Sequence, residues 1–125
     1  MLIIENNKEI RENTTEILEL NNYKVLSTTT GSSGFDLAKQ FSPDLILCDI
    51  MKPETESRIF FKHASMDESI LQIPIILFSE DPSSSEFGQS RLFTNSFLLV
   101  KPFEEKGLLR AVEQCLEQGR FMKGN

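Results

Sequence analysis

The strongest constraint on the fold of this chain is a regular alternation of short apolar segments with longer segments of helical periodicity. In the short segments, apolar or β-branched residues follow one another, which is typical of strands buried in a parallel sheet. Between them, apolar residues recur every three or four positions, which predicts helices. The predicted strands are residues 2–4, 23–29, 44–49, 74–78 and 98–100, and the predicted helices are residues 7–21, 35–41 after a turn at 30–34, 55–67, 80–90 and 103–118.

Five strands alternating with five helices predict a doubly wound parallel sheet with helices on both faces, a three-layer α/β/α architecture. The fourth helix is expected to be short or irregular because its segment is rich in serine and contains Pro82 and Gly88. Gly119 is expected to end the last helix. A chain of 125 residues has room for one domain, so we expect a single domain over residues 1–118 and a disordered tail or the start of a linker over 119–125.

Composition excludes several classes of function. The net charge of -6 argues against direct binding to nucleic acid, which requires a basic face. No apolar run approaches the roughly 20 residues of a membrane span, and Met1 leads at once into a predicted strand, so we expect a cytoplasmic protein without a signal peptide. Cys48 and Cys115 lack metal-ligand spacing and are expected to be core residues.

Polar side chains stand where three of the predicted strands end. Asp49 ends the third strand, Ser79 follows the fourth, and Lys101 follows the fifth. Because open α/β folds carry their chemistry at the carboxyl edge of the sheet, we expect these side chains to meet there. A carboxylate, a hydroxyl and an ammonium group at one edge form a small site suited to an anion. The plainer interpretation of Asp49 as a helix cap or loop acid is less favoured because all three positions fall in register, whereas Ser79 could also simply cap the short helix that follows.

The motifs at this edge resemble those of the receiver domain of two-component response regulators. Residues 5–11 (ENNKEIR) occupy the place of the acidic cluster after the first strand, and residues 49–53 (DIMKP) look like the phosphoacceptor motif. Ser79 falls at the hydroxyl position, and residues 101–103 (KPF) match the Lys-Pro-Phe motif. Each motif is weak alone, but all four fall in register on the alternating α/β pattern, and the resemblance covers the chain from Leu2 to about Leu116. The resemblance implies the flavodoxin-like topology of receiver domains.

The resemblance also implies a phosphoacceptor domain and not an enzyme, with at most self-phosphorylation and autodephosphorylation. Asp49 would attack the phosphoryl group of a phosphohistidine and become an aspartyl phosphate. Lys101 would neutralise one phosphoryl oxygen, and the Ser79 hydroxyl would donate a hydrogen bond to another. The implied partners are a histidine kinase or a histidine phosphotransfer protein, together with an output domain or effector protein, and neither nucleic acid nor a membrane.

The family binds Mg²⁺, which the resemblance assigns here to Glu5, Asn6, Asp49 and the backbone carbonyl of Met51. Asn6 departs from the family pattern, because an amide replaces the second carboxylate of the acidic pair. One fewer negative charge beside a divalent ion weakens its binding by about 1–3 kcal/mol, or roughly 5- to 150-fold. We therefore expect weak Mg²⁺ binding or none, and slow phosphorylation.

A second departure from the family pattern concerns the conformational switch. The family usually has Tyr or Phe three residues before the lysine, whereas this chain has Leu98. Phe97 is one residue earlier, and an offset of one residue on a strand points a side chain to the opposite face. Coupling from Ser79 to the surface of the fourth helix, fifth strand and last helix must therefore proceed without an aromatic ring at position 98.

Three alternatives to phosphoacceptance are open to different degrees. The same fold could serve as a pseudo-receiver, a protein-interaction module that is never phosphorylated. A flavin-binding protein is disfavoured, because the hydroxyl-rich segment at 28–33 follows the second strand and not the first. A phosphatase of the haloacid dehalogenase type is disfavoured because Met51 stands where a second aspartate would act.

Overall fold

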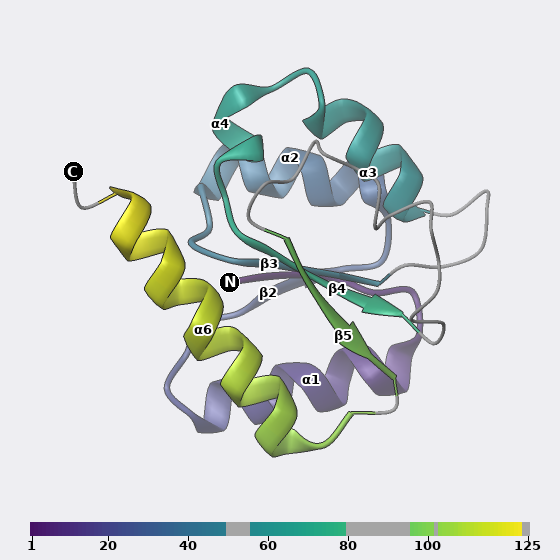
Figure 1. Cartoon of the computed structure of the whole chain (residues 1–125). Coiled ribbons are helices and arrows are strands. Elements are labelled where there is room, and N and C mark those ends of the chain that lie inside the picture. The colour runs from purple at the N-terminus through teal and green to yellow at the C-terminus, as the bar shows by residue number, and fades with distance from the viewer. Residues whose placement is uncertain (50–55, 80–95, 102, 124–125) are drawn as a thin grey trace.

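The structure is a computed structural model that describes residues 1–49, 56–79, 96–101 and 103–123. Five parallel strands form one sheet in the order β2-β1-β3-β4-β5 (Figure 1). The strands are β1 (Leu2–Ile4), β2 (Leu26–Thr28), β3 (Ile46–Asp49), β4 (Ile75–Ser79) and β5 (Ser96–Val100). The helices are α1 (Lys8–Leu20), α2 (Gly31–Phe41), α3 (Glu56–Ala64), α4 (Glu68–Leu71) and α6 (Glu105–Lys123). The doubly wound α/β fold predicted from the sequence is confirmed.

The sheet lies between two layers of helices (Figure 1). On one face, Leu2 and Ile4 of β1 belong to a core cluster that includes residues of α2, α3 and α4. On the other face, Ile3 belongs to a second cluster that includes residues of α1 and α6. Successive residues of a strand point to opposite faces, so the uninterrupted apolar run of β1 supplies both cores.

Helix α2 approaches the sheet closely because Gly34 lies over β1. A Cβ atom at Gly34 would stand 2.5 Å from Cδ1 of Ile4. Thr30 caps this helix, since its side chain accepts a hydrogen bond from the Ser33 N–H. The serine-rich and glycine-rich segment that follows β2 is therefore a capped helix start in close contact with the sheet.

Two predicted boundaries were wrong because of local hydrogen bonds, one between α1 and β2 and one between α3 and α4. The strand predicted over 23–29 is confined to β2, because the Tyr23 N–H still donates to the Leu18 carbonyl at the end of α1. The helix predicted over 55–67 ends at Ala64, and Asp67 starts the separate helix α4 by accepting bonds from the Ser69 and Ile70 N–H groups. Apolar residues continue at helical spacing on both sides of Asp67, but its side chain caps a new helix at that point.

Strand β5 was predicted to start too late, and helix α6 was predicted to end too early. Strand β5 begins at Ser96, which pairs with Ile75 of β4. Helix α6 continues past Gly119 to Lys123, whereas the sequence predicts its end at Gly119. Among the described residues, no glycine has a positive φ, and a glycine with ordinary helical angles costs a helix only about 1 kcal/mol.

The irregular helix predicted over 80–90 lies outside the described residues. Both cysteines are buried and free, as expected for core residues. Within the described part of the chain, no helix combines the length and apolar composition needed to cross a bilayer.

Candidate functional site

Four neighbouring strands deliver polar side chains to one edge of the sheet. Glu5 follows β1, Asp49 ends β3, Ser79 ends β4, and Lys101 follows β5. Glu5 is 1% exposed, Asp49 is 7% exposed and Ser79 is 3% exposed, although their chemistry favours water. Buried carboxylates are stable only when hydrogen bonds or opposite charges compensate for the lost hydration. These side chains therefore form a compact site and not a set of solvated surface groups.

Lys101 links the two carboxylates directly. Its Nζ lies 2.5 Å from Oδ1 of Asp49 and 3.1 Å from Oε1 of Glu5. The Lys101 side chain is 10% exposed, so the ammonium group is largely withdrawn from water. The backbone holds this geometry, because the Lys101 N–H donates a 2.7 Å hydrogen bond to the carbonyl of Ser79. The described centre of the site therefore has one ammonium group between two carboxylates.

The pKa values of Lys101 and Glu5 reflect this arrangement of one ammonium group and two carboxylates. Burial alone lowers the pKa of Lys101, but the hydrogen bond and charge of Asp49, with a further contribution from Glu5, raise that pKa above its ordinary value. Burial and then the negative charge of Asp49 raise the pKa of Glu5, against the opposing effect of Lys101. Two carboxylates share one ammonium group, so an additional cation near Glu5 and Asp49 would favour the ionised form of both.

The neighbouring thiol takes no part in this chemistry. Cys48 precedes Asp49 on β3 and is completely buried. Burial, followed by the charges of Asp49 and Glu5, raises the pKa of the Cys48 thiol, so the sulfur stays protonated.

The turn from β1 into α1 is bonded by two residues to which the sequence assigned no role, Asn7 at the start of α1 and Arg11 within it. The Asn7 N–H donates to Oε2 of Glu5 over 3.2 Å, and the Asn7 side chain accepts from the Ile10 N–H and caps α1. Nη1 of Arg11 donates to the carbonyls of Glu5, over 3.0 Å, and Asn6, over 3.4 Å. An asparagine directly before a helical segment is a recognisable cap signal. The bonds from the Arg11 side chain to the carbonyls of Glu5 and Asn6 carry no such signal.

The donor set at this edge fits Mg²⁺ in kind. Oxygen ligands suit this ion, and the Glu5 and Asp49 carboxylates converge on the same point, the Lys101 ammonium group. Among the described residues, however, no three acidic, histidine or cysteine side chains cluster as metal ligands. The Asn6 side chain is exposed, and Met51 lies outside the described residues. These residues fit a weakly held ion better than a tightly chelated one.

The switch position lies on the face of β5 turned away from α6. Leu98 is 43% exposed, whereas Phe97 is partly buried against the core cluster of α1 and α6. The two side chains therefore point to opposite faces, so Phe97 does not take the place of an aromatic residue at position 98.

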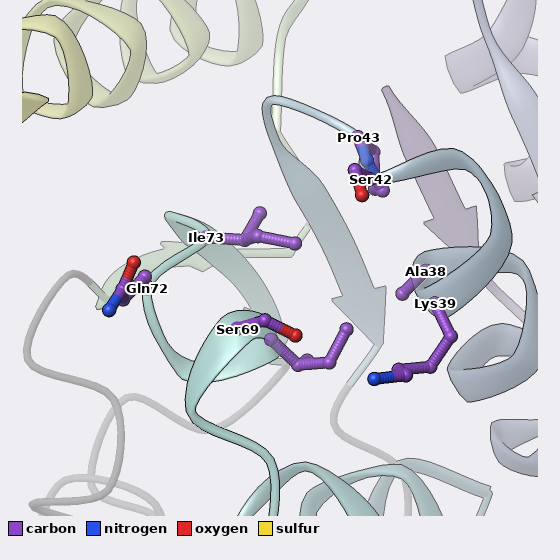
Figure 2. A pocket seen from close by; sticks show the side chains of 8 residues that line it. Ala38, Lys39, Ser42, Pro43, Ser69, Gln72 and Ile73 are labelled. Carbon is purple, nitrogen blue, oxygen red and sulfur yellow. The ribbon is translucent and has the colours of Figure 1, made fainter.

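A cavity of about 130 Å³ lies at the opposite edge of the sheet, between the end of α2 and α4 (Figure 2). Its wall includes the residues that lead into β3 and β4, Pro43 and Ile73. Lys39 is the charged group that lines it, and its Nζ is 2.7 Å from Oδ2 of Asp67. This cavity is separate from the site that contains Asp49.

Comparison with known families identifies the chain. The profile of the response regulator receiver domain matches residues 1–113. The chain belongs to the response regulator receiver domain family. This membership confirms the resemblance that the strand-end motifs indicate.

Individual relatives agree with the family assignment. The chain is 33% identical to the polar-differentiation response regulator DivK of Brucella ovis over 76 residues, which are 61% of this chain and 62% of DivK. It is 26% identical to Protein PilH of Pseudomonas aeruginosa over 117 residues, which are 93% of this chain and 96% of PilH. The alignment with DivK therefore spans somewhat less than two thirds of that relative.

Solved structures show the same fold. The chemotaxis response regulator CheY4 of Vibrio cholerae matches with a TM-score of 0.79 at 22% identity, covering 91% of this chain and 95% of that chain. A CheY-like receiver domain protein of Methanospirillum hungatei matches with a TM-score of 0.81 at 20% identity, covering 97% and 95% of the two chains.

Proposed function

We propose that this receiver domain accepts a phosphoryl group on Asp49 from a histidine kinase or histidine phosphotransfer protein. A carboxylate oxygen of Asp49 forms the new O–P bond, and the N–P bond of the donor phosphohistidine breaks, leaving its electron pair on the imidazole nitrogen. The observation that supports this role is the 2.5 Å contact between Lys101 and Asp49 at the carboxyl edge of the sheet. An ammonium group there can pass from the carboxylate to a phosphoryl oxygen without leaving the site.

Ser79 and Glu5 complete the proposed site. Ser79 ends the strand beside Asp49, and we assign its hydroxyl to a second phosphoryl oxygen. Glu5 and Asp49, with Asn6 and the carbonyl of Met51, would hold Mg²⁺ weakly. The ion supplies positive charge that reduces the repulsion between the carboxylate and the incoming phosphoryl group. Lys101 supplies the same kind of charge from the protein itself.

The output of this proposed reaction is a change in protein contacts. Phosphorylation adds up to about two negative charges beside Lys101, which can bias a two-state element. The exposed Leu98 lacks a ring that could move inward, so the change is expected to be largest close to the site. We assign the readout to an effector protein or an output domain.

The alternative is a pseudo-receiver that binds partners without phosphorylation. It is favoured by Asn6, which removes one of the negative charges that attract Mg²⁺. Beryllofluoride, which mimics a phosphoryl group on aspartate, separates the two functions. With Mg²⁺ and beryllofluoride, we expect amide NMR shifts around Asp49, Ser79 and Lys101 in the native protein and none in Asp49→Asn. A native spectrum unchanged at these residues would favour the pseudo-receiver.

A further inference from the structure

Arg11 connects the first helix to the strand end that carries Glu5. It lies in the first turns of α1, and its guanidinium reaches back to the turn between β1 and α1. Nη1 lies 3.0 Å from the carbonyl oxygen of Glu5 and 3.4 Å from that of Asn6. A guanidinium is rigid and planar, so its hydrogen bonds restrict the orientation of the groups that accept them.

These two carbonyls belong to Glu5 and Asn6, the residues after β1 that are assigned to the proposed cation. The Glu5 side chain is restrained by two further contacts, from the Asn7 N–H to Oε2 and from Lys101 to Oε1. The Asn7 N–H can point at Oε2 only if the peptide groups between the strand and the helix keep their orientation. Arg11 bonds to the two carbonyls of that segment and thereby holds it.

Among the described residues, a second cation near the start of α1 makes no such bonds to the turn. Lys8, which is also in the first turn of α1, carries the same charge, but its side chain is 76% exposed and its contact with Glu12 is 3.9 Å long. The two cations therefore differ in whether they hold the turn.

We propose that Arg11 is a positioning residue that holds the turn after β1 and thereby aims the carboxylate of Glu5 toward the cation at Asp49. The metal part of this inference rests on the proposed function. The orientation of Glu5 does not, because the bond from Asn7 to Glu5 forms without a metal.

The test compares Arg11→Met with Lys8→Met. Each variant removes one positive charge near the start of α1 and inserts a good helix former, but only Arg11→Met removes the bonds to the Glu5 and Asn6 carbonyls. In metal-free protein, hydrogen exchange at the Asn7 amide, corrected for neighbouring residues, reports its bond to Glu5. We expect protection of this amide to fall about tenfold in Arg11→Met and to stay unchanged in Lys8→Met.

Calorimetry with MgCl₂ gives the second readout. The Mg²⁺ dissociation constant should rise about tenfold in Arg11→Met, as is typical when a group that orients a ligand is lost, and should stay close to the native value in Lys8→Met. Arg11→Lys, which keeps the charge and one terminal donor, should restore part of both effects. If native protein binds no Mg²⁺, the metal assignment fails, while Asn7 exchange still decides the role of Arg11.

Native protection of Asn7 in a folded Arg11→Met protein would overturn the proposal. A lower unfolding temperature with unchanged Asn7 exchange would show that Arg11 only stabilises the helix. If Arg11→Met does not fold, Arg11→Lys is the deciding variant, and native protection of Asn7 in it would contradict a role for the guanidinium.

Discussion

At the scale of single residues, the site is governed by an incomplete balance of charge. Lys101 lies within bonding distance of Glu5 and Asp49, so one cation faces two buried carboxylates. A third carboxylate at position 6 would increase the negative charge that attracts a divalent ion. A substitution at Asn6 that adds a carboxylate is therefore expected to increase how tightly the domain holds Mg²⁺.

We expect Asn6→Asp to tighten Mg²⁺ binding by about 1–3 kcal/mol, or roughly 5- to 150-fold, because it adds a carboxylate beside Glu5 and Asp49. Isothermal titration calorimetry with MgCl₂ measures this change. Asn13→Asp, at an exposed position farther along α1, adds the same charge away from the site and serves as the control. Equal affinities in Asn6→Asp and native protein would show that residue 6 does not face the metal.

At the scale of elements, two features add to the apolar packing of α2, the close approach at Gly34 and the ion pair of Lys39. Gly34 lets the helix approach β1, and a Cβ there would stand 2.5 Å from Cδ1 of Ile4. Near the other end of the helix, Lys39 bonds to Asp67, which caps α4. The position of α2 thus depends on the absence of a side chain at Gly34 and on an ion pair, in addition to its place in the core.

Gly34→Ala is expected to destabilise the protein by about 1–3 kcal/mol in urea unfolding, since overpacking outweighs the gain in helix propensity. Gly107→Ala in α6 is the matched control, because a Cβ at Gly107 meets no atom within 4 Å. That control should stabilise by up to about 1 kcal/mol. Ile4→Ala, which removes both Cδ1 and Cγ1, the two atoms within 3.0 Å of a Cβ at Gly34, should lessen the penalty at that position. An additive double mutant would argue against this contact as the cause.

The contact between Lys39 and Asp67 predicts a dependence of stability on pH. The hydrogen bond from Lys39, then that from Ser69, lowers the pKa of Asp67 from 3.8 to about 2. A carboxyl group whose pKa is lower in the folded state stabilises folding above its unfolded pKa, and this contribution is lost as the pH falls toward the folded pKa.

Asp67→Asn should therefore be less stable than native protein at neutral pH, and the difference should shrink as the pH falls from about 4 toward 2. Urea unfolding at a series of pH values measures it. In a Lys39→Met background the same substitution should cost less and depend less on pH. A difference between Asp67→Asn and native protein that stays constant over this range would contradict a charged contact.

Element boundaries that follow from apolar periodicity could be predicted, whereas boundaries that depend on individual hydrogen bonds could not. Periodicity identified the five strands and helices α1, α2, α3 and α6, because burial on the sheet imposes it. It could not identify the break between α3 and α4, which depends on which backbone N–H groups the Asp67 side chain accepts. It also missed the start of β5, because Ser96 joins the sheet by pairing with Ile75 and not through an apolar side chain.

At the scale of the whole molecule, the topology made most of the candidate site predictable. Since the strands are parallel, residues that end different strands gather at one edge, and the sequence alone places Asp49, Ser79 and Lys101 there. It could not predict that Lys101 would also bond to Glu5, or that Arg11 would hold the turn after β1. Those contacts depend on side-chain orientation, which no periodicity encodes.

The central claim is that Asp49 is the phosphoacceptor of this receiver domain. Its most direct test is the intact mass of native protein and of Asp49→Asn after incubation with acetyl phosphate and Mg²⁺. We predict the addition of one phosphoryl group to native protein and none to Asp49→Asn. Absence of any addition to native protein, or an addition that persists in Asp49→Asn, would contradict the claim.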